Sequence, residues 1–203
     1  YTGGAEFENL VTTDTATVTV NDTIDPTTVN LSGSTQVEGP TSSYVFTATL
    51  SHASQGNTTI VTDRGTITIT NGNTVGTLTI AAGNAEDVYV DGSSLVATIT
   101  STSGGNFEQL VVGTGTATAV VNDTIDPTTI TLDGTTNNVT GQITLTAQVD
   151  HAPLTTDLVI TLTNGGPTIT ILAGQTTASV TFANPNPTLS HTYAINTATG
   201  GRY

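Results

Sequence analysis

The residues best suited to chemistry in this sequence are carboxylates near a linker in the middle of the chain. The candidates for a metal site are Glu86, Asp87, Asp91, Asp123 and Asp126. Calcium prefers about six to eight oxygen ligands, from carboxylates, carbonyls and water, in adaptable geometry. Crowded carboxylates also repel one another unless a cation lies between them. These residues are therefore candidates for calcium binding, and the alternative interpretation is a solvated acidic rim.

These carboxylates can share a site only if the strands between them bring their loops to one end. Consecutive antiparallel strands run in opposite directions, so alternate loops lie at the same pole of a sandwich. This parity also places Glu38 and Asp63 at the pole where the first repeat ends. The facing pole of the second repeat would add Asp150 and Asp157.

A repeated segment sets the organisation of the chain. NDTIDPTT begins at Asn21 and again at Asn122, 101 residues later. A threonine- and valine-rich run precedes each copy, and alternation such as TATVTV from Thr15 has the period of a β-strand. The length of the repeat is that of an immunoglobulin-type sandwich. We therefore expect two sandwiches in tandem.

Short alternating segments separated by turn signals predict an all-β protein made of tandem immunoglobulin-like antiparallel β-sandwiches. The strands expected in the first repeat are 29–31, 44–50, 58–61, 66–70, 75–80, 95–100 and 107–121. Those expected in the second are 130–132, 143–149, 158–162, 168–171, 177–182 and 191–195. The second sandwich thus lacks its own last strand.

The predicted domains follow from this count. They are an N-terminal donor-type strand at 1–21, an acidic linker at 22–26, a sandwich at 27–122, a second linker at 123–127 and an incomplete sandwich at 128–203.

The N-terminal run has the sequence of the strand that the second sandwich lacks. The candidate assembly residues are Phe7, Leu10, Val11, Val18 and Val20. The first three match the Phe, Leu and Val of NFEQLVV, which starts at Asn106. An open sheet edge is a template for strand addition. Because the donor precedes the first sandwich and the gap lies in the second, we expect head-to-tail pairing between copies.

Composition excludes several classes of function. The chain has 2 Lys+Arg against 16 Asp+Glu, a net charge of −14 that disfavours nucleic acid and anionic membranes as partners. It has no cysteine, so no disulfide or thiolate metal site is expected. No apolar run is long enough to predict membrane insertion. An acidic, cysteine-free, Thr- and Gly-rich chain favours an extracellular place on a bacterial cell.

Several motifs together resemble a known family. VNDTIDPTT, EDVYVDG at 86–92, the TITI…AAG spacing and GGNFEQL are similar to the extender repeats of large RTX-type adhesins of bacterial biofilms, which type I systems secrete. The resemblance covers both repeats and implies Ig-like sandwiches joined end to end, with calcium rigidifying the junctions. The second repeat departs from it, because Asn184-Pro185-Asn186-Pro187 replaces EDVYVDG.

Nothing in the sequence favours catalysis. The repeat puts His52 and His151 in matching positions one domain apart, so they are not expected to converge with His191 on zinc. No nucleophile-elbow motif occurs, and no acid is set in an apolar context that would raise its pKa. Threonine rows such as TITIT from Thr66 could form a glycan- or ice-binding face, but only 4% of residues are aromatic.

The sequence therefore predicts a non-enzymatic structural module of a bacterial surface adhesin or filament. It would form a rod that calcium stiffens at the domain junctions and that assembles head to tail by donor-strand complementation. Its partners would be copies of itself or adjacent repeats. The alternatives are a segment of extender repeats from a single-chain biofilm adhesin without self-assembly, or a glycan- or ice-binding module.

Overall fold

The computed structural model describes residues 8, 11 and 13–203, and every regular element among them is a β-strand. This confirms the all-β class of tandem sandwiches. The strands of the first sandwich are β1 (Pro26–Gly33), β2 (Thr35–Val37), β3 (Ser43–Leu50), β4 (Thr58–Thr62), β5 (Gly65–Ile69), β6 (Val75–Ala81), β7 (Ser93–Gly104), β8 (Gln109–Val112) and β9 (Thr116–Asn122).

The first sandwich is built from two sheets. Their strand orders are β6-β3-β1-β8 and β2-β9-β7-β4-β5. Burial alternates along the central strands, as in β4, where Thr58, Ile60 and Thr62 are buried and the residues between them are half-buried. The period of two that predicted these strands therefore selects the side chains that face the core.

The last strand of the first sandwich differs from the prediction. A single strand was expected over residues 107–121, but the chain crosses between the sheets and forms β8 and β9 instead. β8 pairs in parallel with β1, whereas β9 pairs antiparallel with β7 and in parallel with β2. The crossing occurs between Thr114, whose carbonyl accepts from the Leu31 N–H of β1, and Gly115, whose carbonyl accepts from the Ile99 N–H of β7. The short strand β2 was not predicted.

The second sandwich has β10 (Ile130–Asn137), β11 (Gln142–Val149), β12 (Leu158–Leu162), β13 (Ile169–Ile171), β14 (Thr177–Ala183) and β15 (Ile195–Gly200). Its sheets have the orders β10-β11-β14 and β13-β12-β15. The strand expected over residues 191–195 is wrong, because β15 begins only at Ile195. In the first sandwich the matching stretch of β7 pairs with β9, and no described strand of the second sandwich takes that place.

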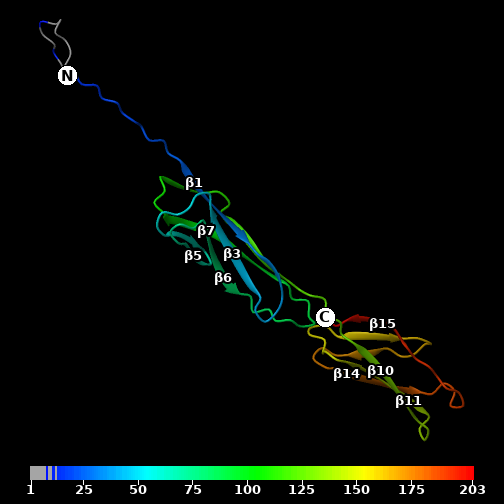
Figure 1. Cartoon of the computed structure of the whole chain (residues 1–203). Helices are drawn as coiled ribbons and strands as arrows, with labels where there is room; N and C mark the ends of the chain where they lie inside the picture. Colours follow the sequence, from blue (N-terminus) through cyan, green and yellow to red (C-terminus); the bar gives the residue numbers. More distant parts are fainter. Residues whose placement is uncertain (1–7, 9–10, 12) are drawn as a thin grey trace.

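Each sandwich has its own hydrophobic core. The first is centred on Phe46, Ile60 and Ile67, all fully buried, and the second on Ile160 and Ile171. The two sandwiches follow one another along the length of the molecule, and residues 13–25 extend from the first sandwich on the side away from the second (Figure 1). We call the end of the first sandwich that faces the second its distal pole.

The described N-terminal residues form no strand. Val11, Val18 and Val20 are 69%, 87% and 90% exposed. The remaining two candidate assembly residues, Phe7 and Leu10, lie outside the described residues.

Candidate metal centre

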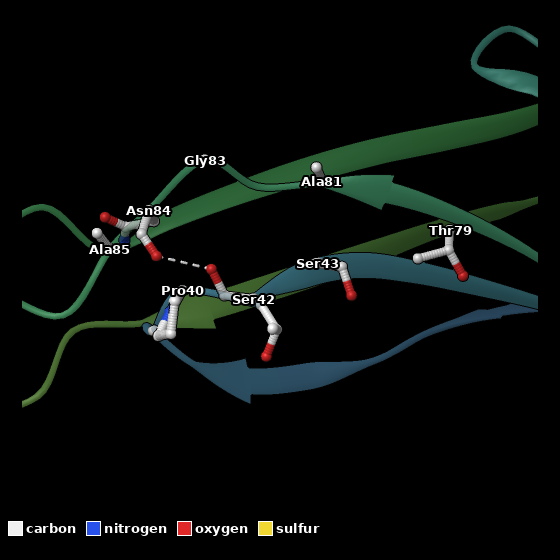
Figure 2. Close-up of a pocket in the computed structure, with 10 residues that line it drawn as sticks. Pro40, Ser42, Ser43, Thr79, Ala81, Gly83, Asn84 and Ala85 are labelled. Atoms are coloured by element: carbon white, nitrogen blue, oxygen red, sulfur yellow. Dashed lines mark hydrogen bonds between the residues drawn. The ribbon is translucent and has the colours of Figure 1, made fainter.

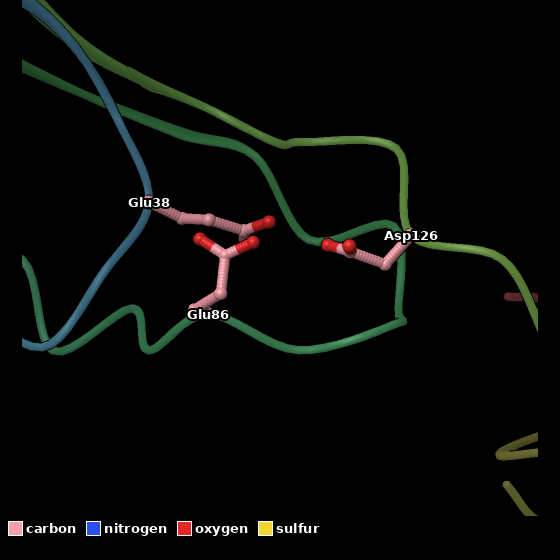
Figure 3. A group of neighbouring side chains, drawn as sticks. All are labelled: Glu38, Glu86 and Asp126. Carbon is pink, nitrogen blue, oxygen red and sulfur yellow. The ribbon is translucent and has the colours of Figure 1, made fainter.

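The distal pole of the first sandwich brings five carboxylates into two groups that share one member. Glu38, Glu86 and Asp126 form the first group (Figure 3). Glu38 forms the second with Asp91 and Asp123. Within each group the carboxylate oxygens lie within 4.8 Å of one another. Four of the five sequence-predicted ligands therefore meet here, around a residue that was not among the five.

Glu38 is the centre of both groups because of the short strand before it. β2 pairs with β9, and the Glu38 N–H donates to the carbonyl of Asn122 at 2.9 Å. The side chain is only 4% exposed, whereas Glu86 and Asp91 are exposed. Parity placed Glu38 at this pole, but nothing local in the sequence indicated its burial.

The loop that carries Glu86 is hydrogen-bonded to the turn that follows Glu38. The Ser42 hydroxyl donates to the carbonyl of Asn84 at 2.7 Å, beside a surface hollow of about 420 Å³ (Figure 2). The Gly39 N–H donates to the same carbonyl at 3.1 Å. The segment before Glu86 is thus fixed to the turn after Glu38.

The second group is closed by a contact between loop and linker. The Asp91 N–H donates to Asp123 Oδ1 at 3.2 Å. At Gly92 an added Cβ would lie 3.1 Å from the backbone nitrogen of Asp123, so this approach leaves little room for a side chain.

A single hydroxyl serves the carboxylates of the first group. The Thr124 Oγ1 lies 2.8 Å from Glu38 Oε1, 2.7 Å from Glu86 Oε1 and 3.3 Å from Asp126 Oδ2. One hydroxyl carries one proton, so it donates to only one of these three acceptors at a time. The Thr124 N–H adds a second bond to Glu38 Oε1, at 2.9 Å.

The second carboxylate oxygen of Glu38 indicates whether this site is suited to a cation. Glu38 Oε2 is buried and has no hydrogen-bond partner. A buried carboxylate oxygen without a partner is costly, and buried charges are normally paired or bound to a metal. The ion pairs among the described residues involve Asp63 and Asp150, not these carboxylates. The donor set, all hard oxygen with one orphaned buried atom, fits calcium.

The crowding shifts two pKa values in opposite directions. The Thr124 N–H and hydroxyl lower the pKa of Glu38 by donating to its ionised carboxylate. Partial desolvation by the surrounding loops raises the pKa of Asp91, and the charges of Asp87 and Glu38 add to that rise. Desolvation, more than repulsion by its neighbours, is therefore the main cause of the raised pKa of Asp91.

The remaining predicted acids lie elsewhere. Asp87 belongs to neither group and accepts a hydrogen bond from the N–H of Tyr89 at 2.8 Å. Asp63 was expected at this pole by parity, but it accepts from the N–H of Thr98. That residue is five positions into β7, about 16 Å along the strand from Ser93. Asp150 and Asp157 are used within the second sandwich, where they accept from backbone N–H groups.

Two tyrosines join the sandwiches across the linker. The rings of Tyr89 and Tyr203 stack with centroids 6.3 Å apart. The Tyr89 hydroxyl donates to the carbonyl of Ala152 at 2.9 Å, and the Tyr203 hydroxyl donates to that of His151 at 3.0 Å. Tyr89 lies between Asp87 and Asp91, so the loop that supplies the carboxylates also contacts the second sandwich.

The fold and this junction define a tandem Ig-like β-sandwich protein with an acidic, oxygen-rich linker. Residues 25–124 and 126–203 match the LapA domain family, and the chain belongs to that family. LapA is a large adhesin of biofilm formation. No helix among the described residues is long and apolar enough to cross a membrane.

None of the curated proteins matches the chain. The chain is similar to the crystal structure of a two domain protein with unknown function from Bacteroides fragilis, with 8% sequence identity over 78% of this chain and 88% of that one, and a TM-score of 0.32.

Proposed function

We propose that the chain is a non-enzymatic structural module of a bacterial cell-surface adhesin, in which calcium holds the two sandwiches as a stiff rod. The observation that carries the proposal is the buried, unpartnered Glu38 Oε2 among carboxylates of the linker and two loops. Calcium would neutralise these charges and bind the linker residues Asp123 and Asp126 to the first sandwich. Membership of an adhesin family supports the cell-surface role.

The test compares calcium with a chelator. A cation that binds only the folded state stabilises it by about 2.7 kcal/mol at a free concentration about a hundred times Kd. Calcium should therefore raise the melting temperature of the first sandwich and narrow the spread of inter-domain distances in X-ray scattering. Glu38→Gln should lose most of both effects, and Asp133→Asn, an exposed acid on β10, should keep them. If a chelator changes neither the melting temperature nor the scattering curve, the proposal is wrong.

If the role of the chain is structural, we expect it to catalyse no reaction. Glycosidase, esterase and protease screens should be negative for the intact protein. An activity that a single loop-acid substitution abolishes would contradict the structural role.

We further propose head-to-tail assembly through the N-terminal strand. Support comes from the sequence of this segment, in which TATVTVN at residues 15–21 is similar to TATAVVN of β9. Val18 and Val20 are exposed in a run that repeats the β9 sequence. Sedimentation over a wide concentration range should reveal association that removal of residues 1–20 abolishes. A monomer at every concentration would refute assembly without touching the calcium site.

A further inference from the structure

The two carboxylate groups at the distal pole are built in the same way. Each takes one residue from the loop between β6 and β7, one from the linker, and Glu38 from the turn after β2. The loop supplies Glu86 to the first group and Asp91 to the second. The linker supplies Asp126 to the first and Asp123 to the second. The pole therefore has two complete sets of three carboxylates that share one member.

The spacing of the oxygens limits how many carboxylates one ion can contact. Calcium binds oxygen at about 2.3–2.6 Å, so two ligands on opposite sides of one ion lie about 5 Å apart. The oxygens within each group lie within 4.8 Å of one another, a distance that one ion can span. The five carboxylates together do not form a group of this size. One ion therefore fits either group but does not fit both at once.

The charge of the five carboxylates also exceeds what one cation balances. The whole chain has only 2 Lys+Arg. The ion pairs among the described residues take up Asp63 and Asp150, and neither residue belongs to the two groups. With all five carboxylates ionised, one divalent cation leaves three negative charges uncompensated and two cations leave one. Because crowded like charges repel one another, a second cation would stabilise the folded pole further.

Glu38 can serve both groups because its two oxygens have different surroundings. Oε1 accepts from the Thr124 N–H at 2.9 Å and lies 2.8 Å from the Thr124 hydroxyl. That hydroxyl is 2.7 Å from Glu86 Oε1, so Glu38 Oε1 lies on the side of the first group. Glu38 Oε2 is buried and has no hydrogen-bond partner. One committed oxygen and one unpaired oxygen are what a carboxylate that bridges two cations requires.

The linker contributes one aspartate to each group. Asp123 and Asp126 lie on either side of Thr124 and Ile125. Ile125 is 97% exposed, so apolar packing does little to hold this part of the linker. A cation in one group would fix one aspartate and leave the other free to turn about it. To hold the linker at both points, a cation is needed in each group.

We propose that the distal pole binds two calcium ions, one in each group, with Glu38 as the bridging ligand. Glu86 and Asp126 would hold one ion, and Asp91 and Asp123 the other. The inference rests on the proposed function, because it assumes that this pole binds calcium, and it specifies how many ions bind and which residues hold each. Full stiffening of the linker then requires both ions.

The first test counts the ions that bind to the intact chain. Metal is removed with a chelator, calcium is titrated back, and the bound ions are counted by calorimetry and native mass spectrometry. The wild type should bind two ions. Asp123→Asn and Asp126→Asn should each bind one, because each substitution removes a ligand of one group only. Glu38→Gln should weaken both ions, and Asp133→Asn, an exposed acid on β10, should still bind two.

The second test asks whether the two ions are neighbours. A wild-type chain loaded with terbium and europium together should show energy transfer between the two lanthanides, because ions that share a carboxylate are adjacent. Asp123→Asn and Asp126→Asn should show none. In calcium, both variants should also give a wider spread of inter-domain distances in X-ray scattering than the wild type does.

The possible results separate this inference from the proposed function. One calcium ion per wild-type chain, with a linker that calcium still stiffens, would overturn the two-ion site and leave the proposed function standing. Two ions that both remain in Asp123→Asn or Asp126→Asn, or that show no energy transfer in the wild type, would also overturn it. A chain that binds no calcium would refute both proposals.

Discussion

Glu38 and Asp91 belong to the same cluster of carboxylates, but their pKa values are shifted in opposite directions. The pKa of Glu38 is lowered, so its bonds to Thr124 contribute stability above about pH 4.5 that is lost as the pH falls through its folded-state pKa. The pKa of Asp91 is raised, so its ionised form opposes folding above its folded-state pKa, and the opposition fades as the pH falls toward 3.8.

Replacing Asp91 with Asn should therefore stabilise the chelated protein at neutral pH, because it removes a charge that partial desolvation and two neighbouring carboxylates disfavour. The gain over the wild type should shrink as the pH is lowered toward 4. With saturating calcium the order should reverse, because the variant has lost a ligand. Melting curves at pH 7 and at pH 3.8, the ordinary pKa of an aspartate, each with calcium and with chelator, measure all four cases. An equal gain at both pH values in chelator would contradict the assignment.

The sequence could predict a residue of the candidate metal centre only where a local pattern determines the position of that residue. Asp123 and Asp126 lie in a repeated linker, and Asp91 lies in a loop whose pole follows from strand parity. Glu38 depends on β2, whose three residues form a strand only because β9 is beside them. Asp63 was misplaced because parity gives the direction of a loop but not its distance along a sheet. Burial and strand offset are tertiary properties that no local pattern contains.

At the scale of elements, alternation identified the central strands well. Residues 44–50 and 158–162 were predicted as strands and form β3 and β12 almost unchanged. The edge strands were less predictable, because their extent depends on a partner. The run before Asn122 was predicted as one strand, but it divides into β8 and β9 and joins two sheets. Residues 191–195 were also predicted as a strand, but β15 begins only at Ile195, and residues 191–194 have no β9 counterpart beside them.

Because each sandwich has its own core, a core deletion should destabilise only its own sandwich. Ile60 on β4 and Ile160 on β12 are both fully buried at matching positions. Replacing either with Ala should cost about 2–5 kcal/mol through lost transfer energy and a residual cavity. Calorimetry should show two transitions, of which Ile60→Ala lowers one and Ile160→Ala lowers the other. If both substitutions move both transitions equally, the sandwiches unfold as one unit.

At the scale of the whole molecule, the link between the sandwiches combines charge and packing. The carboxylates lie within the first sandwich and the linker, so a cation bound there would stiffen the linker but would not by itself set the direction of the second sandwich. Tyr89 and Tyr203 supply that direct contact. Burial, with Tyr89 and Asp150 nearby, raises the pKa of the Tyr203 hydroxyl, which therefore remains a donor to the carbonyl of His151 across the neutral range.

Removing the Tyr89 ring should therefore loosen the angle between the sandwiches without unfolding either. Tyr89→Ala loses the stack, worth about 0.5–1.5 kcal/mol beyond area burial, and the hydrogen bond to Ala152, worth about another 1 kcal/mol. Tyr89→Phe loses only the bond and should have an intermediate effect. Calcium affinity should change little, because neither flanking carboxylate is altered. Distances between spin labels on the two sandwiches, measured in calcium, should broaden for Tyr89→Ala, and Tyr44→Phe, a change inside the first sandwich, is the control. A distribution as narrow as that of the wild type would mean that the linker and its cation hold the rod straight without the aromatic contact.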